Sequence, residues 1–484
     1  MGGKDRLPAA ADAVAVVAER VARARAAQRA FDAATQEEVD EVVTAVGWAI
    51  VDPEHNLALA ETAVQDTGLG NVADKVAKNR RKTMGLLRDL AQAKSVGVIS
   101  EDPEQGLVEI ARPVGVVGAV TPSTNPAATP INNIINALKG RNAIILAPSP
   151  KGASTLALLL AYVHAELDRV GVPRDLVQQL PSPASRELTN ELMRQVDLVV
   201  ATGSQTNVRA AYSSGTPAIG VGVGNVAVIV DETADIADAA GKITRSKIFD
   251  FATSCSSENS VIAVEAVADR LLEALAANGG ALLDPGEAAT LEGSMFVDGR
   301  PAPNFVAQSA RAIALRAGLE REQLLDAAFL IVAETGVGPA HPFSGEKLAP
   351  VLTFYRAPDF AAASALAARL LGYQGAGHSI GLHSRDERRA VELGLALPVC
   401  RVIVNQAHCF ATGGSFDNAL PFSLSMGCGT WGRNSISDNL NYRHFLNITR
   451  VVRPLAPERV REPSEEELFG AYLSKHVRRA GRNP

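Results

Sequence analysis

The first ninety residues place apolar side chains at helical spacing. Four valines fall on one face of a helix, and a threonine–glutamate pair in front of them has the spacing of a capping box. A second helix is predicted around residues 57–64 and ends near Gly68, a residue type that commonly terminates helices. The N-terminal region is therefore predicted to be helical. The valines are Val39, Val42, Val43 and Val46, and the capping pair is Thr35 and Glu38.

From residue 107 onward, short apolar runs alternate with longer segments that have a helical pattern. Short runs rich in valine and isoleucine are typical of buried strands, and their alternation with helices predicts βαβ units and a parallel sheet. The predicted strands are 107–110, 115–120, 143–146, 197–201, 227–230, 260–264, 329–332 and 401–404. The predicted helices are 131–138, 154–167, one from about 207, 236–249, 267–277 and 306–315.

A boundary between two α/β domains is predicted near Asp231, where one series of strands and helices ends and a second begins. The segment after Pro454 is rich in proline, glutamate and arginine and is predicted to be a surface tail. The chain has no internal repeat and no low-complexity tract.

Composition and charge exclude several classes of protein. The 484 residues are 47% apolar and carry a net charge of −6, with 53 acidic and 47 basic residues. Such a chain is neither disordered nor built to coat nucleic acid, because phosphate binding needs a basic excess. No targeting segment and no apolar run of about 18 residues is present, so no membrane span is predicted. We expect a cytoplasmic protein.

The four cysteines are too few and too widely spaced for a zinc ribbon or a disulfide framework, and no metal site is predicted. Cys255 lies among small polar residues between a predicted helix and a strand, so it is a candidate exposed nucleophile. Cys400 lies beside an apolar strand and is predicted to be in the core. Cys409 and Cys428 lie in glycine-rich loops, with no predicted role.

Two glycine-containing segments are candidates for phosphate binding. The run from Gly220 to Gly224 lacks the final glycine of a dinucleotide fingerprint and precedes a strand, so it is a poor candidate. Gly203 and Ser204 directly follow a strand and precede a helix, where free backbone N–H groups would face an anion. A simple capped turn is an equally good local interpretation.

Together these segments resemble the aldehyde dehydrogenase superfamily, and within it the CoA-acylating branch. The resemblance extends from Val14 to Arg453 and rests on several independent motifs in the family's order. These are PVGVV at 113–117, TPSTNP at 121–126, RNAIILAPSP at 141–150, ATGS at 201–204, AYSSGTPAIGVGVGN at 211–225, SC at 254–255, EKLAP at 346–350, GCGTWG at 427–432 and NSISDN at 434–439.

The resemblance implies a role for individual residues. Cys255 matches the catalytic thiol, and Asn125 matches the asparagine whose amide, with the backbone N–H of Cys255, holds the oxyanion. Glu346 matches the glutamate that binds the nicotinamide ribose. The remaining residues implied to bind the dinucleotide are Thr121, Pro122, Gly203, Ser204 and Gly222.

The chain differs from the hydrolytic members of the family at the position of their general base, and this difference predicts which molecule accepts the acyl group. Those members hold a general-base glutamate at a place that aligns with Gly220, so no base is predicted to activate water. A thioester on Cys255 would then persist until the thiol of CoA attacks it. The alternative is a hydrolytic enzyme that uses another carboxylate, such as Glu258, as base. A non-catalytic protein on this fold is the remaining possibility.

The expected cofactor is NADP or NAD. NAD-preferring hydrolytic members hold a glutamate after the second strand, whereas this chain has Ser149 and Lys151 in that region. Loss of the carboxylate removes a repulsion toward a 2′-phosphate, which slightly favours NADP.

The expected substrate is a short polar aldehyde, with sulfoacetaldehyde first and succinate semialdehyde or acetaldehyde behind it. Small and polar residues around 408–416 favour such a substrate. Candidate contacts to substrate or CoA are His378, His408, Thr412 and Arg433, although the histidines could equally be structural and Arg433 simply exposed.

The resemblance also implies the architecture. A Rossmann-like cofactor domain would comprise 1–98 and 113–232, and an α/β catalytic domain 233–435. Strands within 99–112 and 440–455 would bridge subunits of a homodimer or homotetramer, because an exposed strand edge needs a partner. Residues 456–484 would form the surface tail.

Overall fold

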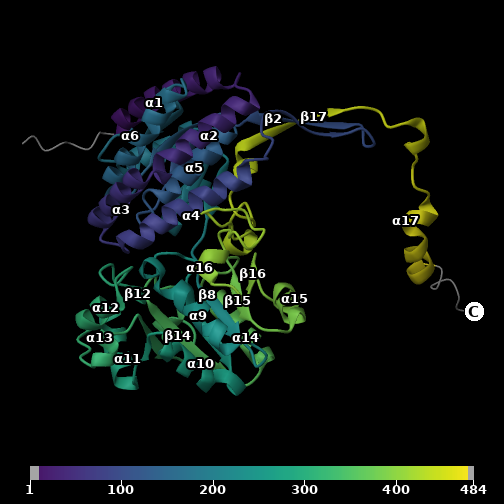
Figure 1. Ribbon diagram of the computed structural model, residues 1–484. Helices are drawn as coiled ribbons and strands as arrows, with labels where there is room; N and C mark the ends of the chain where they lie inside the picture. Colours follow the sequence, from purple (N-terminus) through teal and green to yellow (C-terminus); the bar gives the residue numbers. More distant parts are fainter. Residues whose placement is uncertain (1–9, 478–484) are drawn as a thin grey trace, which may run out of the picture. The chain divides into compact units, whose positions relative to one another are not determined.

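The computed structural model describes residues 10–477, which form two compact units (Figure 1). The first unit contains residues 10–95 and Pro113–Leu446, and the second contains Val96–Arg112 and 447–477. No helix in the described part of the chain is long and apolar enough to cross a membrane.

The first unit begins with four helices, as the hydrophobic pattern predicts. They are α1 (Ala10–Phe31), α2 (Gln36–Val51), α3 (Pro53–Thr67) and α4 (Val72–Leu90). The capping box is confirmed, because Glu38 N–H donates to Thr35 Oγ1 and Thr35 N–H donates to Glu38 Oε2. Gly68 ends α3 in the left-handed conformation, with φ of 66°.

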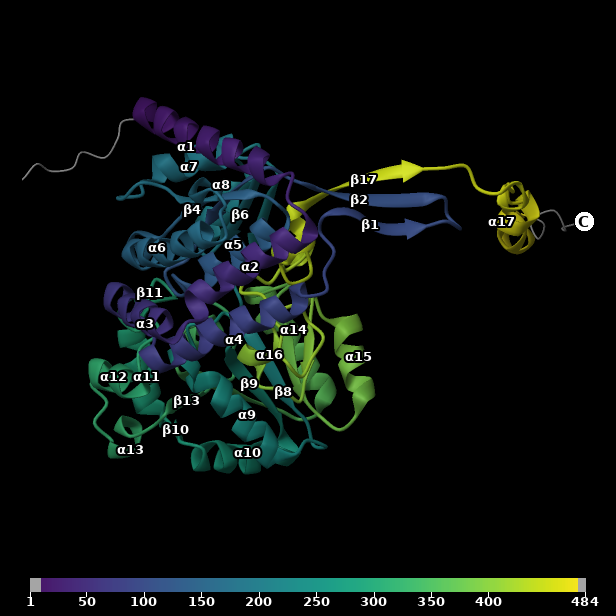
Figure 2. The same cartoon turned by 45° about the horizontal axis from the view of Figure 1, so that its top comes forward.

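A five-stranded parallel sheet follows, in the order β5-β4-β3-β6-β7. Because the chain crosses over between the neighbouring strands β3 and β6, their carboxyl ends border a crevice of the kind that binds dinucleotides. Figure 2 shows α1 and α7 on one side of this sheet and α2 and α5 on the other. The strands are β3 (Val116–Val120), β4 (Ala143–Ala147), β5 (Val177–Gln179), β6 (Leu198–Thr202) and β7 (Ala218–Val221), and the intervening helices are α5 (Ala128–Lys139), α6 (Ala153–Arg169), α7 (Arg186–Gln195) and α8 (Gln205–Tyr212).

The second sheet has seven parallel strands in the order β10-β13-β14-β9-β8-β15-β16. Its central strands β8 and β9 are buried along their whole length because helices cover them. The strands are β8 (Val226–Val230), β9 (Glu258–Val264), β10 (Gly280–Leu282), β13 (Phe329–Ala333), β14 (Val351–Ala357), β15 (Ile380–His383) and β16 (Val402–Val404). The helices of this region are α9 (Ile236–Ile248), α10 (Glu265–Ala277), α11 (Pro285–Met295), α12 (Ala310–Ala317), α13 (Glu322–Leu325), α14 (Phe360–Tyr373), α15 (Glu387–Ala396) and α16 (His408–Ala411), with a small hairpin of β11 (Phe296–Val297) and β12 (Arg300–Pro301).

The structure corrects the predicted boundary near Asp231. The strand predicted at 227–230 is β8, which pairs with β9 and β15 of the second sheet. The first sheet instead ends with β7, a four-residue strand that the sequence pattern did not reveal. The change of sheet therefore falls between Val221 and Val226.

The predicted helix 306–315 is also displaced. Ala307 has φ of 52°, which a helix cannot accommodate, and Ser309 caps the helix that follows by accepting from the Ala312 N–H. As a result, α12 begins at Ala310.

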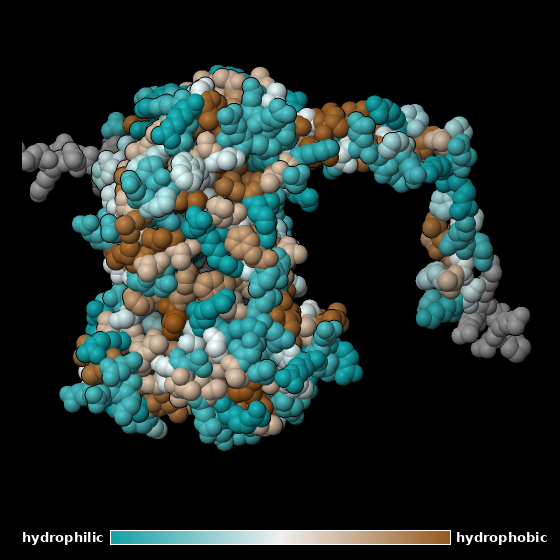
Figure 3. Space-filling model, in the orientation of Figure 1, coloured by the Kyte–Doolittle hydropathy of each residue, from teal (hydrophilic) through white to brown (hydrophobic). Residues whose placement is uncertain are grey.

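The second unit is a three-stranded sheet with a C-terminal helix. Strand β2 (Leu107–Pro113) lies between β1 (Gly97–Asp102) and β17 (Leu446–Val452), and Figure 2 shows all three side by side. Within the segment predicted as a tail, a capping box between Ser464 and Glu467 begins α17 (Glu465–Tyr472). Hydrophobic side chains are exposed along this unit (Figure 3): Val451, Val452, Leu455, Val460, Leu468, Phe469 and Tyr472.

Candidate active site

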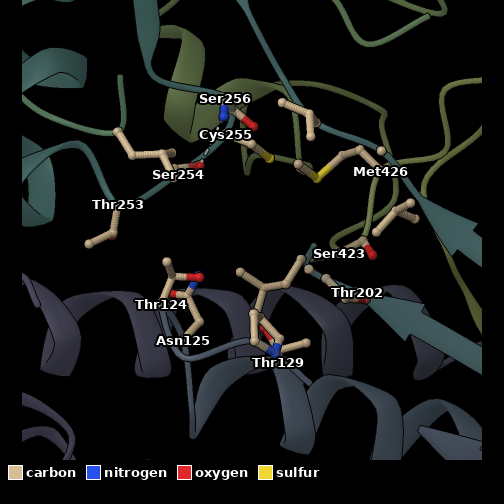
Figure 4. Close-up of a pocket in the computed structure, with 18 of the residues that line it drawn as sticks. Thr124, Asn125, Thr129, Thr202, Thr253, Ser254, Cys255, Ser256, Ser423 and Met426 are labelled. Atoms are coloured by element: carbon tan, nitrogen blue, oxygen red, sulfur yellow. Dashed lines mark hydrogen bonds between the residues drawn. The ribbon is translucent and has the colours of Figure 1, made fainter. Parts of the chain in front are cut away.

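A pocket of about 300 Å³ lies within the first unit. The loops that follow β3, β6 and β7 of the first sheet line it, together with the segments that precede β9 and β14 of the second sheet. In the close-up, Thr124 and Asn125 lie across the open space from Ser254 and Cys255 (Figure 4). The pocket brings together seven of the residues selected from the sequence: Pro122, Asn125, Gly203, Ser204, Gly222, Cys255 and Glu346.

Cys255 lies in a tight connection between α9 and β9. The preceding residues Asp250, Phe251 and Ala252 all have positive φ, between 49° and 58°, so the backbone turns sharply before the cysteine. The side chain of Cys255 is partly exposed to the pocket. Burial of the sulfur, reinforced by the nearby charge of Glu346, raises the pKa of the thiol to about 12.

A buried ion cluster holds this turn in place. The carboxylate of Asp250 is fully buried and accepts from Lys78 Nζ at 2.5 Å and from Lys75 Nζ at 3.1 Å. Although burial raises the pKa of Asp250, the two lysines lower it below its usual range. Asp250 also accepts from the hydroxyl of Thr253, two residues before the cysteine. The strained turn is therefore fixed from the helix α4, which carries both lysines.

Lys78 also sets the orientation of the Asn125 amide. Its Nζ donates to Asn125 Oδ1 at 2.9 Å, so the amide oxygen faces the lysine. The amide nitrogen makes a single long contact, 3.5 Å to the Thr124 hydroxyl. The N–H donors of Asn125 are thus available to an oxygen atom in the pocket.

A network of buried amides clamps the loop that carries Glu346. Asn225 donates to the carbonyl of Ser344, and Asn259 donates to both Asn225 Oδ1 and the carbonyl of Gly345. The fully buried Lys347 donates to the carbonyl of Phe343 at 2.6 Å and to three further acceptors in the same region. These contacts fix the backbone on both sides of the glutamate.

Glu346 itself retains an unpaired oxygen at the pocket. Among the described residues, its buried Oε1 has no hydrogen-bond partner. Burial raises the pKa of this carboxyl group to about 8, although the backbone N–H of Gly224 opposes the shift. An unpaired acceptor in this position fits a hydroxyl group such as that of a ribose.

The glycines before β8 are required by close packing rather than by phosphate binding. A Cβ atom on Gly224 would lie 2.1 Å from the carbonyl oxygen of Cys255, so only glycine fits there. Gly220, the predicted counterpart of the base position, lies outside the pocket lining. A Cβ on Gly220 would point at Val208 and Tyr212 of α8, and Gly222, not Gly220, lines the pocket.

Glu258, the first residue of β9, follows the loop that carries Cys255 and does not line the pocket. It is fully buried, and its Oε1 accepts from the backbone N–H of His408 at 3.0 Å. Burial raises its pKa to about 7. Glu346 is therefore the only carboxylate among the described residues that line the pocket.

The four candidate contacts to substrate or CoA lie outside the lining of this pocket. His378, His408 and Thr412 are buried, and none of them lines the pocket. His408 Nδ1 lies 2.9 Å from the carbonyl of Ser256 and so contacts the loop that carries Cys255. Burial lowers the pKa of His378 to about 3 and that of His408 to about 4, so both rings are neutral. Arg433 is exposed outside the pocket.

Three other predicted cofactor residues lie beside the pocket and do not line it. Thr121 is buried at the carboxyl end of β3, where its N–H donates to the carbonyl of Ala147. Ser149 and exposed Lys151 follow β4, the neighbouring strand. The buried hydroxyl of Ser149 has no partner among the described residues.

Sequence reasoning missed the lysines of α4. Lys75, Lys78 and Lys82 occupy one helix about a turn apart, and all three are buried. Their spacing resembles the solvated face of an amphipathic helix, so only the unusual burial in the structure identifies them. No group of three His, Cys, Asp or Glu side chains in residues 10–477 could hold a metal ion.

Comparison with known proteins places these features in a family. The model described as "Aldehyde dehydrogenase family" matches residues 7–296. An acetylating aldehyde dehydrogenase from Geobacillus thermoglucosidasius, a solved structure, has a TM-score of 0.89 and 36% identity, and the match covers 94% of this chain and 99% of that one. The chain belongs to the aldehyde dehydrogenase family, among its acylating members, which confirms the predicted fold class and family.

The descriptions of two further relatives name a substrate or a bound ligand. The acylating sulfoacetaldehyde dehydrogenase of Cupriavidus necator is 62% identical over 467 residues, which span 96% of this chain and 94% of the relative. A propionaldehyde dehydrogenase of Rhodopseudomonas palustris, solved with bound CoA and an acylated cysteine, has a TM-score of 0.80 and 25% identity, with coverage of 90% and 97%.

Proposed function

We propose that this protein oxidises a short polar aldehyde to its CoA thioester, with sulfoacetaldehyde as the physiological substrate. The observation that carries the reaction is the arrangement of Cys255 across the pocket from the Asn125 amide, whose oxygen faces Lys78 and whose nitrogen makes only a long contact, to Thr124, within the described residues. The 62% identity to the sulfoacetaldehyde dehydrogenase of Cupriavidus necator supports the choice of substrate.

The chemistry begins at the sulfur. The thiol of Cys255 gives up its proton to solvent as the sulfur adds to the aldehyde carbon, and the oxyanion that forms accepts hydrogen bonds from Asn125 and from the backbone N–H of Cys255. Each such donor typically contributes about 3–4 kcal/mol to transition-state stabilisation. Departure of the carbon-bound hydrogen with its electron pair then leaves a thioester on Cys255. The thiolate of CoA adds to this thioester, and the bond to Cys255 breaks to release acyl-CoA.

The dinucleotide-binding role rests on the crevice at the carboxyl ends of β3 and β6. Gly203 and Ser204 line it there, and the unpaired oxygen of Glu346 fits a ribose hydroxyl. When bound, an oxidised nicotinamide supplies the hydride acceptor. The turn after β4, which contains Ser149 and Lys151, has no carboxylate that would repel a 2′-phosphate. This favours NADP over NAD.

The exposed hydrophobic side chains of the second unit support assembly into a homodimer or homotetramer through its strands. We further propose a cytoplasmic location, because the reaction depends on a reduced thiol. In this proposal the cofactor domain contains the first sheet, and the catalytic domain contains the second.

A panel of aldehydes tests the substrate. With CoA and NADP present, we expect kcat/KM for sulfoacetaldehyde to exceed the value for acetaldehyde by about tenfold or more, the effect of roughly one charge-assisted hydrogen bond. We expect it also to exceed the value for succinate semialdehyde, which is charged but longer. Repeating the panel with NAD tests the cofactor preference. A higher kcat/KM for either competing aldehyde would overturn the proposed substrate.

The orientation of Asn125 by Lys78 predicts a difference between two buried lysines. In Lys78→Met the Asn125 amide loses the contact that fixes its oxygen. We expect kcat to fall by about tenfold or more, which is less than the loss of about 10²–10³ that follows complete removal of an oxyanion donor. Lys75→Met is the matched comparison, because Lys75 also pairs with Asp250 but makes no contact with Asn125. It should lose similar stability and much less kcat. Equal losses of kcat, measured together with Tm, would contradict the orienting role.

A further inference from the structure

Lys82 is a buried cation that lines the pocket without a carboxylate partner. Its side chain is 8% exposed, and its Nζ donates to the carbonyl of Gly413 at 2.7 Å. Among the described residues this is the only hydrogen bond from an ammonium group that has three donors. Lys75 and Lys78, on the same helix, both pair with Asp250, whereas no carboxylate within residues 10–477 lies within 4 Å of Lys82 Nζ.

An unpaired buried charge is costly and needs a reason. Burial lowers the pKa of Lys82 to about 7, with the neighbouring Arg81 adding to the shift. An anion that enters the pocket would restore the charged form and pair with it. The one carboxylate that lines the pocket, Glu346, belongs to the clamped loop of the second sheet and makes no ion pair with Lys82.

The absence of a side chain at Gly413 lets the backbone pack directly against this ammonium. A Cβ atom on Gly413 would lie 2.7 Å from Lys82 Nζ and 2.5 Å from the carbonyl oxygen of Ser423. Both Gly413 and Ser423 line the pocket. Thr129, on the adjacent helix α5, also lines it, and its buried hydroxyl has no partner in the described part of the chain. Among the described residues, the pocket lining thus contains an amino group with further donors to offer and a hydroxyl without a partner, and both can bind an oxyanion.

We infer that Lys82, assisted by Thr129, binds the anionic end of the substrate and selects sulfonated over uncharged aldehydes. This inference rests on the proposed function and assigns its substrate specificity to one side chain. A sulfonate remains charged at every physiological pH and offers three oxygens, so it satisfies the ammonium and the hydroxyl together. A carboxylate of similar reach shares this chemistry, and the choice between them is part of the test.

The test compares Lys82→Met with wild type on a charged and an uncharged aldehyde of matched length. We expect kcat/KM for sulfoacetaldehyde to fall about 10- to 100-fold, mainly through KM, because the lost contact is a hydrogen bond to a charged group. The value for propanal should change less than about threefold, since no contact to Lys82 is lost with that substrate. Lys94→Met removes an exposed lysine outside the pocket and should leave both values unchanged.

A binding measurement gives a readout that does not require turnover. Isethionate, an unreactive alcohol with the same sulfonate, should inhibit wild type competitively and inhibit Lys82→Met about 10- to 100-fold more weakly. If Lys82→Met does not fold, Thr129→Val removes the hydroxyl proposed to assist Lys82 at nearly constant volume and should raise KM for sulfoacetaldehyde more than for propanal. Succinate semialdehyde shows whether a carboxylate uses the same site.

The outcomes separate this inference from the proposed function. Equal losses for sulfoacetaldehyde and propanal would mean that Lys82 acts on Cys255 or on the fold, and would overturn the inference while sulfoacetaldehyde remains the substrate. A wild-type enzyme that oxidises propanal with CoA but not sulfoacetaldehyde would overturn the proposed substrate. In that case, a selective loss on succinate semialdehyde would still support Lys82 as the anion-binding residue.

Discussion

Cys255→Ala is expected to lose at least about 10,000-fold in kcat for aldehyde-dependent reduction of the dinucleotide, in line with the loss of a nucleophile in other covalent enzymes. The reason is that every bond-making step of the proposed reaction passes through this sulfur. Among the described residues, Cys409 is the other thiol that lines the pocket; it lies at the start of α16, where its backbone N–H donates to Ser246 Oγ.

The controls for this variant address folding and the other thiols. Cys255→Ala should retain the wild-type Tm within a few degrees, because removing one partly exposed sulfur leaves only a small cavity. Cys400→Ala should retain near-wild-type kcat, because Cys400 lies outside the pocket. Mass spectrometry after incubation with aldehyde and oxidised dinucleotide should find an acyl group on Cys255 in wild type. Substantial activity in Cys255→Ala would refute the assignment.

The fold could be predicted well from sequence where strands are apolar throughout. Buried parallel strands such as β4 and β6 are short apolar runs rich in valine, isoleucine and leucine, a pattern typical of strands covered on both faces. Prediction failed at β7, because its four residues include a glycine and follow a proline. The boundary near Asp231 was wrong for the same reason, since β8 was assigned to the sheet that β7 completes.

The site could be predicted only as far as its motifs extend. Cys255, Asn125 and Glu346 lie in segments that resemble a known family, and the structure places all three at one pocket. The lysines of α4 are about 170 residues from Cys255 in the chain, and nothing in their local sequence indicates burial. Their roles depend on long-range contacts with Asp250 and Gly413, which only the folded structure brings together.

The histidines illustrate the opposite error. His378 and His408 seemed from their glycine-rich and polar surroundings to be candidates for ligand contact. Both are instead buried, and burial keeps the rings neutral; His408 lies against the carbonyl of Ser256 in the loop that carries Cys255. Small neighbours allow a side chain to be packed tightly as readily as they allow a ligand to approach it.

The described residues that line the pocket include no carboxylate free to activate water, so we expect release of the acyl group from Cys255 to depend on CoA. Water would have to attack the thioester without the help of a general base, an effect that typically contributes about 10²–10⁴ in rate. Glu346 is the one carboxylate among the described lining residues, and its proposed place is at the ribose. The thiol of CoA needs less assistance, because a fraction of it is already thiolate near neutral pH.

The most direct test of the account is therefore rapid-mixing kinetics with and without CoA. In the absence of CoA we expect a single burst, at most one reduced dinucleotide per Cys255, followed by a steady rate at least about 100-fold below the rate with CoA. Addition of CoA should restore full turnover and yield acyl-CoA in amounts equal to the reduced dinucleotide. Full-rate turnover without CoA, with release of the free acid, would contradict the acylating mechanism.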